Sequence, residues 1–160
     1  MTQASDIRGA TLSTVAAGLV GGTTTTYTTT GIVTGAIGGL FATPLAAQTN
    51  TATPTTQGDG SAFVALAASQ VTVFTFCITA AGAIAVFQGA VEDLDEGDAV
   101  IIAPQFASID EKTYLPFGYG VIVAASTASA WTFGASNWTA TGITDTFTDV
   151  MTMPRRPVSA

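Results

Sequence analysis

The sequence predicts an all-β fold, an antiparallel β-sandwich or jelly-roll-like barrel with an extended N-terminal arm. Short runs rich in Val, Thr, Ile and aromatic residues recur along the 160-residue chain, and Gly and Pro separate them at regular spacing. No window combines a helical apolar period with helix caps. The chain is also long enough to bury one self-sufficient core, so a single β-rich domain is expected.

The longest uncharged apolar run, residues 71–91, is predicted to form a β-hairpin. Its length would also suit a helix that crosses a membrane, and that alternative stays open. Its first part, however, is built of Val, Thr, Phe and Ile, which favour strands, and Gly82 can supply the positive φ of a hairpin turn. We therefore expect strands over Val71 to Thr79 and over Ala83 to Val91.

Shorter strands are expected on both sides of this hairpin. They are predicted at residues 23–34, 36–44, 61–68, 99–103, 117–125, 131–133 and 143–153. Residues 48–60 contain turn-forming residues without an apolar period, which predicts a loop. The expected organisation is an N-terminal arm at residues 1–60, a β-sandwich core at residues 61–157 and a tail at residues 158–160.

The composition argues against catalysis and against nucleic-acid binding. The chain has no His, which is the commonest general base and metal ligand. The single cysteine, Cys77, lies in an apolar run and is interpreted as a small buried hydrophobe, and the single lysine, Lys112, is kept charged by the neighbouring Asp110 and Glu111. A net charge of −7 disfavours binding to a phosphate backbone. We expect a protein that is not an enzyme, has no cofactor and binds no nucleic acid.

The acidic segment at residues 92–98 holds five of the eleven acidic residues. Carboxylates are the ligands that calcium prefers, but the spacing does not fit a helix-loop-helix calcium site. Two interpretations remain open, a solvated turn between strands and a calcium site.

Two arginines near the C-terminus form a second charged feature. Arg155 and Arg156 stand between Pro154 and Pro157, and the prolines favour an extended segment that leaves the sheet. The arginines could bind carboxylates of a neighbouring subunit, or the segment could be a frayed end.

The N-terminal part of the chain is free of charge over a long distance. Between Arg8 and Asp59 there are fifty consecutive uncharged residues. Natural monomers usually protect exposed sheet edges with Lys, Pro or bulges, and this chain has one Lys. We expect such a surface to lie against other protein, through homo-oligomerisation or attachment to a larger lattice.

Four segments of the sequence resemble a known group of proteins. The stretches AFVALAASQVTVFTFCITAAGAIAVFQGAVEDL, APQFASI, LPFGYGVIVAA and WTFGASNWTATGITDTFTDVMTMPRRP resemble small structural proteins of tailed-bacteriophage virions. The resemblance covers residues 60–157 and, more loosely, the N-terminal part. It implies a virion protein on the capsid surface, a decoration or cement protein that binds the major capsid protein, with a homotrimer favoured. A head-fibre, spike or tail component with an adhesive role is the alternative, and a membrane-associated β-protein is a further class that we do not favour.

Three aromatic residues are candidate anchors of an interface. Trp131, Phe133 and Trp138 are large side chains of the kind that dominates interface energetics. Alternation along the strand also permits a place in the sandwich core, at least for Trp131 and Phe133.

Overall fold

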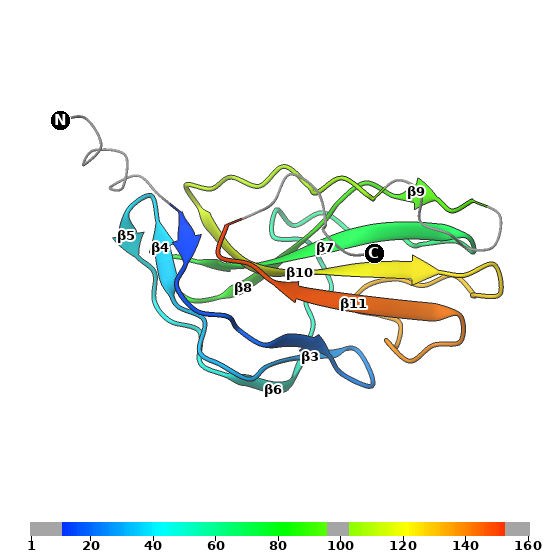
Figure 1. Cartoon of the computed structure of the whole chain (residues 1–160), viewed down its shortest axis with the longest axis horizontal. Coiled ribbons are helices and arrows are strands. Elements are labelled where there is room, and N and C mark those ends of the chain that lie inside the picture. Colours follow the sequence, from blue (N-terminus) through cyan, green and yellow to red (C-terminus); the bar gives the residue numbers. More distant parts are fainter. Residues whose placement is uncertain (1–10, 96–102, 153–160) are drawn as a thin grey trace.

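The computed structural model of the chain describes residues 11–95 and 103–152, and these residues form an all-β fold (Figure 1). The predicted all-β sandwich class is confirmed, because the described residues contain eleven strands in three antiparallel sheets that pack together. The strands are β1 (Leu12–Ser13), β2 (Leu19–Gly21), β3 (Thr26–Thr29), β4 (Gly35–Ile37), β5 (Leu40–Phe41), β6 (Gln48–Ala52), β7 (Gln70–Thr79), β8 (Ile84–Gln88), β9 (Glu92–Asp93), β10 (Tyr114–Ala124) and β11 (Ile143–Asp149).

The main sheet is built around β7 and has the strand order β11-β10-β7-β8, with the short β9 paired to the start of β7. The predicted hairpin is confirmed as β7 and β8, and Gly82 in its turn has a φ of +77°. The interpretation of residues 71–91 as a membrane helix is wrong, because the run forms two paired strands. In the described ranges we find no helix with the length and apolarity that a membrane crossing requires.

A β-bulge in β10 sets which side chains face the core. Pro116 pairs with Cys77 and Gly118 pairs with Phe76, so that Phe117 is an extra residue with no partner of its own. The side chain of Phe117 lies in the core, with its ring centroid 6.3 Å from that of Phe76. The bulge thus brings one more aromatic ring to the centre of the sandwich.

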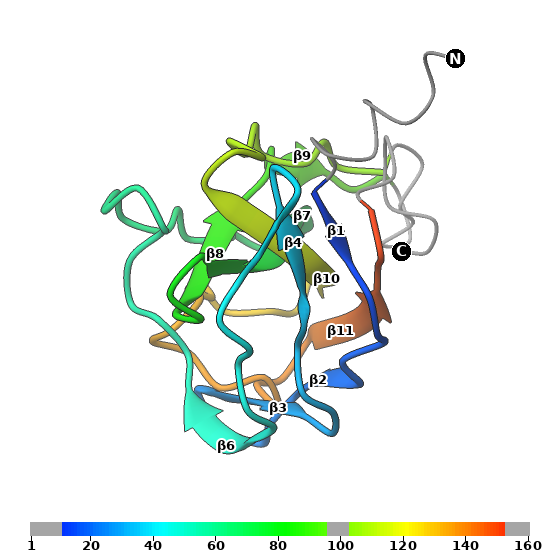
Figure 2. The same cartoon turned by 90° about the vertical axis from the view of Figure 1, so that its left-hand side faces the viewer.

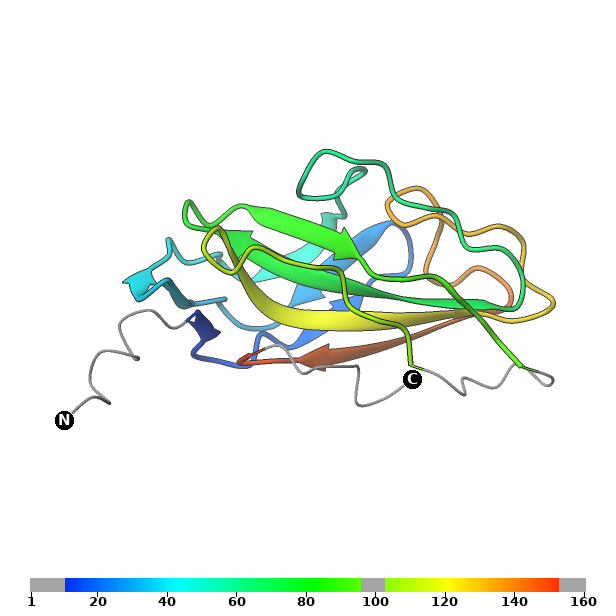
Figure 3. The ribbon, with the colours of Figure 1, turned by 90° about the horizontal axis from the view of Figure 1, so that it is seen from above.

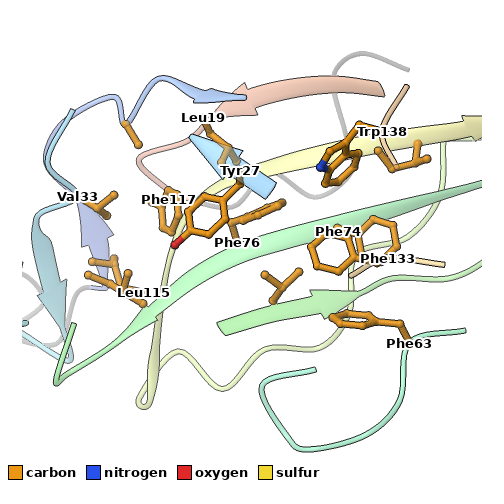
Figure 4. Close-up of a cluster of buried hydrophobic side chains, with 14 of the residues drawn as sticks. Leu19, Tyr27, Val33, Phe63, Phe74, Phe76, Leu115, Phe117, Phe133 and Trp138 are labelled. Atoms are coloured by element: carbon orange, nitrogen blue, oxygen red, sulfur yellow. The ribbon is translucent and has the colours of Figure 1, made fainter. Parts of the chain in front are cut away.

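The N-terminal strands form the second layer of the sandwich. The sheets β1-β4-β5 and β2-β3-β6 lie against one face of the main sheet (Figure 2). Leu19, Tyr27 and Val33 are buried there, and the Tyr27 and Phe76 ring centroids are 6.0 Å apart (Figure 4). Residues 11–52, which belong to the arm expected from the sequence, therefore share one hydrophobic core with the strands that follow residue 61.

The opposite face of the main sheet is covered as well. The irregular segment at residues 103–113, which precedes β10, crosses this face (Figure 3), and its residues Phe106, Ala107 and Ile109 pack on it. Strand β7 is therefore buried at eight of its ten positions and carries no charge, which is why its sequence resembles a membrane span. Cys77 is buried there with a raised thiol pKa, caused by desolvation.

Some local predictions differ from the structure. Residues 61–68 and 131–133 form isolated bridges, such as Leu66 with Trp131, where strands were expected. Gln48–Ala52, the start of the expected loop, instead forms β6 because β3 offers it a partner, and Asn50 N donates to Thr28 Oγ1. The expected strand at residues 99–103 lies almost wholly outside the described residues.

Candidate interaction surface

The three aromatic candidates lie in the core of the sandwich. Trp131 and Phe133 are 1% exposed and Trp138 is 3% exposed. Figure 4 shows Phe133 and Trp138 turned toward Phe74 and the main sheet. The indole nitrogens are satisfied internally, since Trp131 Nε1 donates to Asn137 O at 2.9 Å and Trp138 Nε1 donates to Thr26 O at 2.7 Å. The core alternative holds for all three, and these side chains offer no surface to a partner.

The charged candidates, the two C-terminal arginines and the acidic segment, lie partly or wholly outside the described residues. Arg155 and Arg156 lie outside the described residues, so their role stays a prediction. In the acidic segment, β9 pairs with β7 and Asp93 Oδ1 accepts a hydrogen bond from Gln70 Nε2 at 3.1 Å, whereas residues 96–98 are not described. Within residues 11–95 and 103–152 no three potential metal ligands come together, and the calcium interpretation stays untested for the full segment.

One edge of the main sheet is covered by the chain itself. Gly58 N donates to Val86 O at 3.0 Å, and Gln88 N donates to Gln57 Oε1 at 2.8 Å. Gln88 Oε1 in turn accepts from Val64 N. The loop at residues 57–64 thus replaces a neighbouring strand along β8, so this edge is protected without any Lys.

The uncharged N-terminal layer, by contrast, carries most of the exposed large hydrophobic side chains of the described residues. Seven large hydrophobic side chains are exposed among the described residues, and five of them fall in the uncharged stretch between Arg8 and Asp59. These five are Val15, Val20, Ile32, Leu40 and Phe41. Single exposed apolar residues are ordinary, but their concentration in one charge-free layer makes this layer the candidate interaction surface.

The turn and the outer strand of the β4–β5 hairpin carry the two most exposed large hydrophobic side chains of this layer. Gly38 and Gly39 form its turn, and both have positive φ, 56° and 83°, which residues with a Cβ rarely adopt. Directly after the turn, Leu40 is 77% exposed and Phe41 is 86% exposed. Consecutive strand residues point to opposite faces, so both faces of β5 are bare. The sequence signal for this site is a Gly-Gly turn followed by two large apolar residues in a charge-free stretch, which our residue-by-residue predictions missed.

A surface pocket lies beside the hairpin turn. It has a volume of about 380 Å³ and is lined by Thr11, Gly38, Ile109, Asp110, Glu111 and Lys112. Thr11 joins its two sides, because Gly38 N donates to Thr11 Oγ1 and Thr11 Oγ1 donates to Glu111 O. Hydrogen bonds from Thr113 Oγ1 and Lys112 N hold the pKa of the Asp110 carboxyl below its ordinary value. The pocket therefore combines an apolar wall at Ile109 with one exposed cation and an acidic rim.

Comparison of the chain with protein-family models, with curated proteins and with solved structures gives no match.

Proposed function

We propose that this chain is a structural subunit of a bacteriophage virion, a capsid decoration or cement protein that associates with copies of itself and with the major capsid protein. The observation that carries the proposal is the N-terminal layer of the sandwich. It lies in the stretch without charge between Arg8 and Asp59, and it holds five of the seven large hydrophobic side chains that are exposed in the described residues. Such a layer gains free energy when another protein covers it. The resemblance of residues 60–157 to virion proteins supplies the class of partner.

The proposed mechanism is the addition of buried interface. A chain that bridges neighbouring shell subunits removes apolar surface from water at each contact, and a specific interface of ordinary size buries about 1,600 Å² in total. Many copies on one shell would multiply this contribution and help the shell to resist internal pressure. The mechanism requires no reaction, only a rigid body with an adhesive face.

Quantitative mass spectrometry of purified particles tests the proposal. We expect a copy number comparable to that of the major shell protein, and particles made without this chain should lose integrity at a lower temperature. A copy number of only a few per particle would favour the alternative, a fibre, spike or tail component. Absence from particles would overturn the proposal as a whole.

A further inference from the structure

We propose that Phe41 of one copy of this chain docks in the pocket beside Lys112 of a second copy. This inference deepens the proposed function. It requires the self-association part of the proposed function, but it does not require that the protein is part of a virion.

The first step is the cost of leaving the hairpin bare. Phe41 and Leu40 are the two most exposed of the large hydrophobic side chains in the described residues. Removal of one such side chain from water is favourable in proportion to the apolar area that is buried. Within residues 11–95 and 103–152 no element covers the side chains of Leu40 and Phe41, so a second molecule that closes around them gains this free energy.

The second step is the chemistry of the pocket. A volume of about 380 Å³ can take one aromatic side chain, and Ile109 offers that ring an apolar wall. Lys112 brings an aliphatic stem and an ammonium, and an ammonium over the face of an aromatic ring is attractive. The Asp110 carboxylate is engaged by Thr113 Oγ1 at 2.6 Å and by Lys112 N at 3.0 Å, so its hydrogen bonds lie within its own turn.

The third step is the reason why the partner is a copy of the same chain. Gly38 belongs to the hairpin turn and also lines the pocket, so the projection and the pocket lie at the same end of the molecule, the end that carries β4 and β5 in Figure 1. Each copy then supplies one projection and one pocket. Such a pair of features satisfies a reciprocal two-fold contact or a closed ring.

Charge also favours this contact between copies. Two chains of net charge −7 repel each other, and the pocket itself has an acidic rim at Asp110 and Glu111, so a docking segment that brings no further carboxylate limits the repulsion. The hairpin lies in the charge-free stretch, so it approaches the pocket of the next copy without adding an acid. The ammonium of Lys112 is the one lysine charge of the chain, and it stands where the aromatic ring arrives.

Sedimentation equilibrium over a concentration series, at fixed moderate salt, tests the contact. We expect the natural chain to associate, and we expect Phe41→Ser and Lys112→Glu each to weaken the association by at least about tenfold. Val64→Ser is the matched control, because Val64 is 58% exposed but lies outside the uncharged layer, and it should leave the association unchanged. Far-UV circular dichroism checks that every variant is folded.

A mixing experiment gives the sharper readout. Phe41→Ser chains keep the pocket and Lys112→Glu chains keep the aromatic ring, so a mixture of the two can form the intact contact that neither forms alone. We expect the mixture to associate more tightly than either variant does alone. A chain that carries both changes should gain no association when it is mixed with either single variant.

The inference is overturned if the natural chain stays monomeric, if Phe41→Ser associates as tightly as the natural chain, or if mixing brings no gain. The virion proposal fails or stands separately, on the presence of the chain in purified particles.

Discussion

The main sheet and the N-terminal layer differ in how many of their faces are buried. Strand β7 is buried at eight consecutive positions, because one of its faces meets the N-terminal layer and the other meets the segment at residues 103–113. Strand β5 is exposed at both of its positions, and β6 is exposed at three of five. The N-terminal layer is thus packed against other residues on one face only, the face that meets the main sheet. The outer face of the layer is therefore exposed, and it is the face that we propose to bind another copy.

The strongest test of this comparison is the core that the two regions share. Tyr27→Ala removes a ring that is 1% exposed and packs against Phe76, and we expect a loss of about 3–5 kcal/mol in the free energy of unfolding. Urea unfolding followed by tryptophan fluorescence and by far-UV circular dichroism should give coincident transitions. Thr49→Ala, on the exposed side of β6, is the control and should cost less than about 0.5 kcal/mol. An unchanged unfolding midpoint in Tyr27→Ala would mean that the layer is an independent arm.

A smaller effect is expected at the seam where β11 holds the N-terminal layer. The Asp149 carboxylate accepts hydrogen bonds from Gly18 N at 2.8 Å and from Leu19 N at 3.0 Å. Asp149→Ala leaves both donors without this partner, so we expect a loss of about 1–3 kcal/mol, measured by urea unfolding. Asp149→Asn keeps one acceptor oxygen and should lose less. If Asp149→Ala is as stable as the natural chain, the seam does not depend on this carboxylate.

The smallest effect, and one of opposite sign, is expected inside β7. The Thr75 hydroxyl is buried, and within the described residues it has no hydrogen-bond partner. Thr75→Val replaces it with a methyl group of similar shape, so we expect a gain of about 1 kcal/mol in thermal or urea unfolding. Thr72→Val, on the same strand, is the matched control and should be destabilising, because Thr72 Oγ1 donates to Ala90 O at 2.9 Å. Equal losses of unfolding free energy in both variants would contradict the interpretation that the Thr75 hydroxyl lacks a hydrogen-bond partner.

The elements that could be predicted from the sequence are those with a strong local pattern. The β7–β8 hairpin is one, because β-branched and aromatic residues surround a turn that Gly82 permits. The register of β10 could not be predicted, because the bulge at Phe117 depends on the packing of that ring against Phe76. Strand β6 was missed because its residues favour turns and only pairing with β3 makes it a strand.

The candidate interaction surface also has one feature that could be predicted from the sequence and one that could not. The charge-free stretch is visible in the sequence, and in the described residues it holds five of the seven exposed large hydrophobic side chains; its contact with other protein stays a prediction. The choice of anchors within the molecule could not be made from residue type. Trp138 is a better interface residue than Leu40 by composition statistics, yet Trp138 is buried and bonded to Thr26, whereas Leu40 projects from a hairpin.

The sequence by itself determined the all-β class and the position of the charge-free layer, because strand preference and charge are properties of local composition. The tertiary structure alone decided which apolar side chains are covered. Burial depends on what the rest of the chain places over a residue, so Trp131, Phe133 and Trp138 were enclosed by distant strands while Phe41 was left bare beside the Lys112 pocket.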